Sequence, residues 1–181
     1  MPHRLDRGLG TVGMLKGRMG GPGSLLVIMP MLLDSKFSIA GVGNATDTTD
    51  DTLFSTAITT GTLPKDGDAL VLNCFGVFAA NANNKTVKVI FGATTLVSSG
   101  VVALNGKAWW VVAEITRSGL TTQLGFGEYS ADTATAEVLT KTAPGETLSA
   151  AVTLKVTGAS PTTGAANDVL AYRYRLLGLK S

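Results

Sequence analysis

Few residues in this chain could carry out catalytic chemistry. The sequence contains one histidine, His3, and one cysteine, Cys74. A single cysteine cannot form a disulfide within the chain, and one histidine leaves no basis for a Ser–His–Asp triad, a Cys–His pair or most metal sites. We therefore expect a protein that is not an enzyme and that uses no metal and no cofactor.

Acidic residues suggest two alternatives to that expectation. Glu114 and Glu128 fall on neighbouring expected strands, and a glycoside hydrolase needs two carboxyl groups about 5–10 Å apart in a cleft. Asp47, Asp50 and Asp51 could bind a cation, but their spacing differs from that of the twelve-residue calcium loop. The ordinary interpretation is a glutamate facing solvent or an interface, and solvated acids in a loop.

A glycine motif near the start matches the dinucleotide-binding pattern G-x-G-x-x-G at residues 8–13. That pattern functions only between a strand and a helix, whose N-terminus holds the pyrophosphate. Glycines at 17, 20, 21 and 23 and Pro22 prevent a helix from following. We therefore expect no nucleotide site.

The composition favours a β-sheet protein. Only 15% of the residues are charged, 45% are hydrophobic, and the net charge of +2 is too small to suggest nucleic acid binding. The apolar run at residues 25–33 is interrupted by Pro30 and is far shorter than the roughly 20 residues that span a bilayer. We expect a soluble protein made in the cytoplasm, with no membrane and no nucleic acid partner.

From residue 44 onward, short apolar segments alternate with turn signals at intervals of roughly 10–12 residues. About nine strands are expected, at 52–58, 69–79, 85–91, 94–98, 107–117, 120–129, 134–142, 148–157 and 168–177. No helical segment separates them, which predicts an all-β, antiparallel, jelly-roll-like β-sandwich.

Two of these strands have an expected position in the sandwich. Residues 69–79 are apolar on both faces, so this strand should be central. Residues 85–91 should form a half-buried strand, with Lys85 and Lys88 on the solvent side, away from the valines of the core.

Residues 1–43 differ in composition from the rest and are expected to form an extended N-terminal arm, followed by a sandwich domain at 44–181. This segment contains nine of the 22 glycines. We expect it to attach the chain to a neighbour, although a leader followed by a first core strand is the alternative. The expected assembly residues are basic or apolar: Arg4, Arg7, Lys16, Arg18, Leu25, Leu26, Val27, Ile28, Leu32 and Leu33.

Trp109 and Trp110 must point to opposite faces of their strand, because strand side chains alternate. One should lie in the core and the other at an interface or against a sugar. In the last strand, Arg173 and Arg175 are expected to share the outward face with Ala171, opposite Tyr172 and Tyr174. Trp109, Trp110, Arg173 and Arg175 are thus candidate interface or glycan contacts.

Five segments together resemble tailed-bacteriophage virion proteins: DTTDDTL at 47–53, LPKDGDAL at 63–70, FAANANNKTV at 78–87, WWVVAEITRSG at 109–119 and AANDV at 165–169. The resemblance covers about residues 46–177 and leaves the arm outside. It implies a jelly-roll-like sandwich, often trimeric, of the kind found in capsid decoration proteins, head fibres and tail-fibre tips.

These observations predict a virion structural protein: a homotrimeric capsid decoration protein whose arm binds the major capsid protein or another virion protein. The alternative is a receptor-binding tail tip, in which loops at 81–84 and 105–106 contact a host surface glycan. The glycoside hydrolase remains a third hypothesis.

Overall fold

The computed structural model describes residues 30–132 and 137–181, and these contain ten strands and no helix. The strands, in chain order, are β1 (Met31–Gly43), β2 (Asp51–Ile58), β3 (Ala69–Phe78), β4 (Thr86–Phe91), β5 (Thr94–Ser98), β6 (Ala108–Gly119), β7 (Thr122–Ala131), β8 (Glu137–Thr142), β9 (Val152–Ala159) and β10 (Val169–Leu179).

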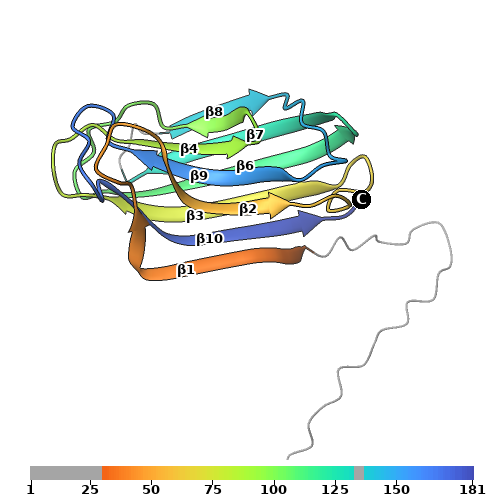
Figure 1. Cartoon of the computed structure of the whole chain (residues 1–181), viewed down its shortest axis with the longest axis horizontal. Coiled ribbons are helices and arrows are strands. Elements are labelled where there is room, and N and C mark those ends of the chain that lie inside the picture. Colours follow the sequence, from red (N-terminus) through yellow and green to blue (C-terminus); the bar gives the residue numbers. More distant parts are fainter. Residues whose placement is uncertain (1–29, 133–136) are drawn as a thin grey trace, which may run out of the picture.

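The strands form two sheets that stack face to face (Figure 1). The larger sheet has the order β1-β10-β3-β6-β7-β8 and the smaller has the order β2-β9-β4-β5. Every strand pair is antiparallel. The predicted antiparallel jelly-roll-like β-sandwich is confirmed.

The core lies between the two sheets and is built from every second residue of their strands. In β3, Leu70, Leu72, Cys74 and Phe78 are fully buried, as the alternation predicted. This strand lies between β10 and β6, so its predicted central position is also confirmed. The turn that precedes it contains Gly67 at a φ of +91°, a conformation that glycine adopts without steric cost.

Residues 31–43, which the sequence assigned to the arm, form β1 and pair with β10. Leu33 packs against the core, and Lys36 donates hydrogen bonds to Asp34 and to the Ser55 carbonyl of the other sheet. For this part of the segment the structure therefore agrees with the alternative, a first core strand. Residues 1–29 lie outside the described residues.

The last strand contains a bulge that the sequence pattern did not reveal. Ala171 pairs with Gly76 and Arg173 pairs with Phe75, so Tyr172 is an extra residue opposite two consecutive residues of β3. Ala171 is consequently buried, and the prediction that it shares the arginine face is wrong. Beyond the bulge, Tyr174 and Leu176 point into the core and Arg173 and Arg175 point outward, as expected.

Candidate functional site

The outer face of the six-stranded sheet is the most unusual surface of the described residues, because large apolar side chains are exposed there among charged ones. Its side chains belong to the strand positions that alternate with the core. Phe75 is 46% exposed, Phe126 44% and Leu139 73%, and Val71, Val112 and Trp110 lie between them, half-buried. Monomeric soluble proteins rarely expose an apolar patch that extends over several strands.

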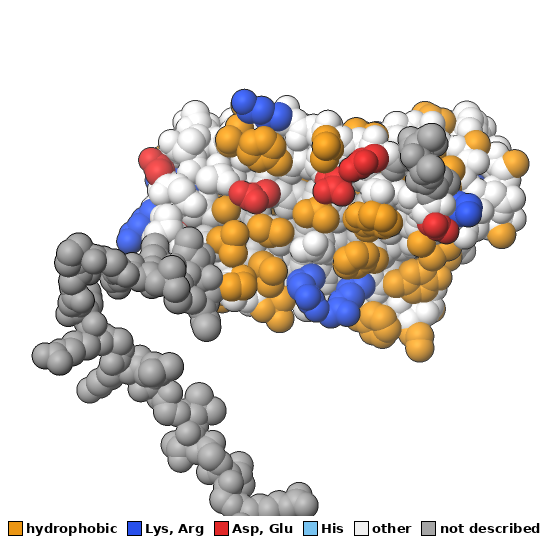
Figure 2. Space-filling model, turned by 180° about the vertical axis from the view of Figure 1, so that it is seen from behind, with side chains coloured by type: hydrophobic (Ala, Val, Ile, Leu, Met, Phe, Trp, Pro, Cys, Tyr) orange, Lys and Arg blue, Asp and Glu red, His pale blue; other side chains and the backbone are white. Residues whose placement is uncertain are grey.

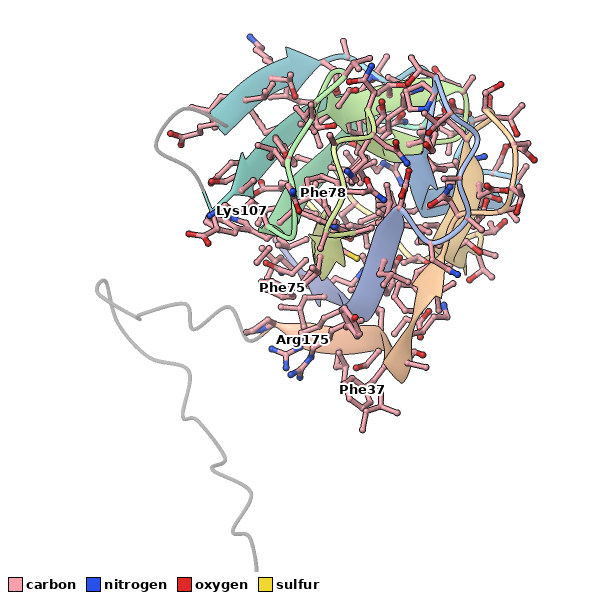
Figure 3. The ribbon with its side chains drawn as sticks, turned by 90° about the vertical axis from the view of Figure 1, so that its left-hand side faces the viewer. Phe37, Phe75, Phe78, Lys107 and Arg175 are labelled. Atoms are coloured by element: carbon pink, nitrogen blue, oxygen red, sulfur yellow. The ribbon has the colours of Figure 1, made fainter. Side chains whose placement is uncertain are left out.

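The strand register arranges this face, which we call the outer face, in three rows that run across the strands from β10 to β8. The first row is Leu177, Val71, Glu114, Phe126 and Lys141; the second is Arg175, Asn73, Val112, Glu128 and Leu139; the third is Arg173, Phe75, Trp110, Ser130 and Glu137. Figure 3 shows Phe75 and Arg175 on the outer side of the sheet, whereas Phe78 points between the two sheets.

Two arginines and two glutamates lie on opposite halves of the outer face, and Lys141 lies beyond the glutamates on β8. Arg173 and Arg175 are exposed neighbours on β10, while Glu114 and Glu128 occupy adjacent rows on β6 and β7. Figure 2 shows the same separation, with basic side chains near one side of an apolar field and acidic side chains across from them. Among the described residues, none of these four side chains forms an ion pair.

A hollow of about 490 Å³ opens on the acidic half of the outer face. Glu114, Phe126, Glu128, Leu139 and Lys141 contribute to its lining. The structure therefore brings Glu114 and Glu128 to one site, as the hydrolase hypothesis requires. The hollow also combines an aromatic ring with carboxylates, which suits a polar ligand that has an apolar face.

The two tryptophans point to opposite faces, as predicted. Trp109 is 1% exposed and packs in the core over Gly76, where even a methyl side chain would collide with the indole ring. Trp110 lies on the outer face, paired with Phe75. Of the predicted contact residues, Trp110, Arg173 and Arg175 thus share one surface, and Trp109 is excluded from it.

Phe126 and Leu139 were not among the surface residues expected from the sequence. Each is the apolar member of a strand face that also carries a charge: Glu128 follows Phe126 and Lys141 follows Leu139 at the next outward position. The sequence did contain a signal for an apolar outer surface, because the neighbouring strands 69–79 and 107–117 have apolar residues on both faces. It could not be used, because the sequence does not say which face is inside.

Most of the predicted arm residues lie outside the described residues. Arg4, Arg7, Lys16, Arg18, Leu25, Leu26, Val27 and Ile28 belong to residues 1–29. Leu32 is 58% exposed and pairs with Leu177, and Leu33 packs on the core beside Gly178. These two leucines therefore contribute to the sandwich itself.

The loop at 81–84, expected to contact glycan in the alternative function, encloses a buried polar cluster instead. The Lys85 ammonium donates to the carbonyl oxygen and the side-chain oxygen of Asn81 at 2.9 and 2.8 Å, and to the carbonyl oxygen of Asn83 at 2.9 Å. The two asparagine amides donate in turn to the Asp168 carboxylate at 2.7 and 2.9 Å. The loop thus binds Asp168, the residue that precedes β10, and stabilises the start of that strand.

Lys85 and Asp168 are respectively 0% and 1% exposed, so a buried cation and a buried anion face each other through the asparagines. The expectation that Lys85 belongs to the solvent side is wrong, because Lys85 lies two residues before Val87 and therefore shares its buried side. The loop supplies the oxygens that replace water around its ammonium group. Burial lowers the pKa of Lys85. Burial alone would raise the pKa of Asp168, but hydrogen bonds from Asn81, Ser160 and Asn83 together with the Lys85 charge lower it.

The loop acids considered for a cation act separately. Asp47 accepts hydrogen bonds from the Thr49 backbone and hydroxyl, Asp50 pairs with Lys88, and Asp51 accepts from the Ala45 backbone. The described part of the chain contains no group of three or more acidic, histidine or cysteine side chains suited to hold a metal ion. It also contains no helix long and apolar enough to cross a membrane.

Comparisons with known proteins assign no family to this chain. No family model and no curated protein matches the chain. One solved structure, the lectin UEA-II in complex with galactose, is similar over 83% of this chain and 92% of its own, with 9% sequence identity and a TM-score of 0.37. A similarity this distant carries no conclusion about the present chain.

Proposed function

We propose that this chain is a non-enzymatic structural protein of a tailed-phage particle, a capsid decoration protein that functions through assembly contacts. The observation that carries the proposal is the outer face, where the exposed side chains of Phe75, Phe126 and Leu139 form an apolar patch that a permanently monomeric protein rarely leaves uncovered. The sequence segments that resemble phage virion proteins support the same role.

The structure also suggests which part of the chain would form the folded body and which part would attach it to the particle. The sandwich begins at Met31, the first residue of β1, and the basic and apolar residues 4–28 precede it. We assign attachment to that preceding segment, whose arginines and lysine would steer it towards acidic subunits and whose leucines would bury apolar surface there.

The test uses particles of the phage that encodes the chain. Mass spectrometry of purified particles should detect the chain, and electron microscopy should locate its copies on the shell. Absence of the chain from particles would refute the virion role.

A deletion variant tests the arm separately. The chain without residues 1–29 should fold, because every described strand is retained, but it should not bind to particles that lack the protein. Its control is the full chain carrying Lys155→Glu, a charge change on the smaller sheet. Unchanged binding of the deletion variant would exclude the arm as the attachment.

Glycan binding is the second candidate, and the hollow beside Phe126 is the observation that favours it. An aromatic ring can stack on the apolar face of a sugar while Glu114 and Glu128 accept hydrogen bonds from its hydroxyls. The test is titration with polysaccharide from the host surface. Phe126→Ala should abolish saturable binding, whereas Leu120→Ala, an exposed leucine outside the hollow, should not.

Analysis of the polysaccharide after incubation addresses the remaining hypothesis. Release of shorter sugars that stops in Glu114→Gln and Glu128→Gln would establish a hydrolase. An unchanged polysaccharide supports the proposal that the chain is not an enzyme.

A further inference from the structure

We infer that the outer face binds a second copy of this chain in a two-fold, face-to-face arrangement. The inference rests on the proposed assembly role, names the partner of the same surface, and differs from the homotrimer that the sequence resemblance implies. It is carried by the register of the strands, because the charges and aromatic rings of the outer face are placed so that the surface is complementary to itself.

The symmetry axis would run parallel to the strands and pass between β3 and β6, the two middle strands of β10, β3, β6 and β7. Rotation about this axis lays β10 of one copy over β7 of the other and β3 over β6. Residues keep their rows, because such a rotation does not shift positions along the strands. The two sheets then pack with their strands nearly aligned, as in other sandwiches.

In the second row, this arrangement places Arg175 opposite Glu128 of the other copy. By symmetry the same pair forms twice, which is the defining property of a two-fold interface. Arg173 lies one row away on the same strand, within the reach of an extended arginine side chain.

The apolar residues agree with the same axis. In the third row Phe75 meets Trp110 of the other copy, and in the first row Leu177 meets Phe126. The centre of the contact would therefore be aromatic, with arginine–glutamate pairs beside it, which is typical of stable protein interfaces.

An axis perpendicular to the strands does not satisfy the charges. It would lay each strand over its own copy, so that β10 with its two arginines would face β10. Like charges placed opposite each other across an interface are strongly unfavourable. The distribution of charge therefore selects one of the two simple ways to stack this sheet on itself.

Within a single copy the charge distribution is unfavourable. Arg173 and Arg175 are neighbours on one strand face, and Glu114 and Glu128 lie diagonally across β6 and β7. Like charges at such positions repel. A second copy places Arg175 directly opposite Glu128, whereas Glu114 lies opposite Val71 and only diagonal to that arginine, so the second copy reduces the repulsion.

The outer face has about the area that a stable protein complex buries on each partner. The same rotation lays β1 over β8, so all six strands take part. Six strands about 4.8 Å apart and about eight residues long at 3.3 Å each cover roughly 750 Å². A stable complex of standard size buries about 800 Å² on each partner. The outer face is therefore large enough for a dimer without any other contact.

The experiment measures the mass of the full chain in solution by light scattering and sedimentation, over a range of concentrations. The unmodified chain should form dimers. Arg175→Glu alone and Glu128→Arg alone should each raise the Kd of the dimer at least about 100-fold, since each brings two pairs of like charges together. Lys155→Glu, the same charge change on the other sheet, should leave the dimer unchanged.

Mixing the two single variants is the decisive step. In a mixed dimer, one of the two symmetric contacts is the unmodified pair of Arg175 with Glu128. The other contact joins the two substituted positions, where glutamate and arginine have exchanged places, so both pairs are again complementary. Equimolar Arg175→Glu and Glu128→Arg chains should therefore form dimers together, although neither does so alone. Because the sites are on the surface, each variant should keep the far-ultraviolet circular dichroism spectrum of the unmodified chain, although loss of the dimer lowers its Tm by mass action.

A monomeric or trimeric unmodified chain would overturn the inference, as would a dimer that withstands both reversals or two variants that fail to restore it when mixed. These outcomes are independent of the particle experiment. A chain present on particles but monomeric in solution would refute the two-fold contact alone, and a dimer absent from particles would refute the virion role alone.

Discussion

The buried cluster of Lys85 and Asp168 allows a quantitative prediction about stability. Replacing Lys85 by Met removes an ammonium group that donates to three oxygens, all of them in the loop at 81–84. Each buried acceptor left without a donor costs about 1–3 kcal/mol. Asp168 also loses the positive charge that favours its ionised form.

These losses are partly offset, because methionine does not have to be desolvated as an ammonium group does. Removing one partner of a buried charge pair costs about 3–5 kcal/mol, and we expect Lys85→Met to fall in this range. For a chain of this size that free energy lowers the Tm by on the order of 10 °C.

The assay is urea unfolding of the full chain, followed by intrinsic tryptophan fluorescence. Lys88→Met is the matched control on the same strand: Lys88 pairs with Asp50 at 2.6 Å, but the two side chains are 30% and 31% exposed. Such a surface pair contributes at most about 1 kcal/mol. If Lys85→Met costs no more than Lys88→Met, the cluster does not stabilise the fold and the reasoning is refuted.

Three further predictions follow from described residues. Deleting residues 1–29 should leave the free energy of unfolding equal, within error, to that of the full chain. Deleting residues 1–43 should lower it sharply, because β1 is lost and β10 becomes an edge strand. Circular dichroism and urea unfolding distinguish the two outcomes. The pKa of Asp68 and of Asp168 is lowered from 3.8, so their stabilising contribution is present above that pH and should be lost as the pH falls through and below it. Acid titration of Asp168→Asn should show a shallower decline, and an unchanged profile would contradict it. Burial raises the pKa of Cys74 to about 12, so the native chain should resist iodoacetamide at pH 8 and react only when unfolded; rapid native labelling would contradict that burial.

The fold could be predicted because its evidence is local. Alternation within β3 and β6 and turn residues such as Gly67 identify strands without reference to the rest of the chain. Pairing between strands that are distant in the sequence produces no local sequence pattern. β1 pairs with β10, which is more than 120 residues away in the sequence. No pattern in residues 31–43 indicates which strand they pair with.

The candidate site could be predicted only in part, for a similar reason. Trp110, Arg173 and Arg175 were identified as surface candidates, but their rows depend on the register of four strands and on the bulge at Tyr172. Lys85 shows the opposite case: a charge on a strand normally indicates solvent, and only the oxygens of Asn81 and Asn83 make its burial tolerable.

The two-fold arrangement and the proposed attachment support each other geometrically. A rotation about an axis parallel to the strands preserves the direction of every strand, so Met31 lies at the same end of both copies. Both copies of β1 would then begin at the same side of the dimer. Two linked attachments to one surface hold far more firmly than either alone, because the second binds at a high effective concentration. Arg175→Glu, which separates the copies, should therefore weaken binding to particles even though it leaves residues 1–29 intact, and equal occupancy by this variant and the unmodified chain would separate the two proposals.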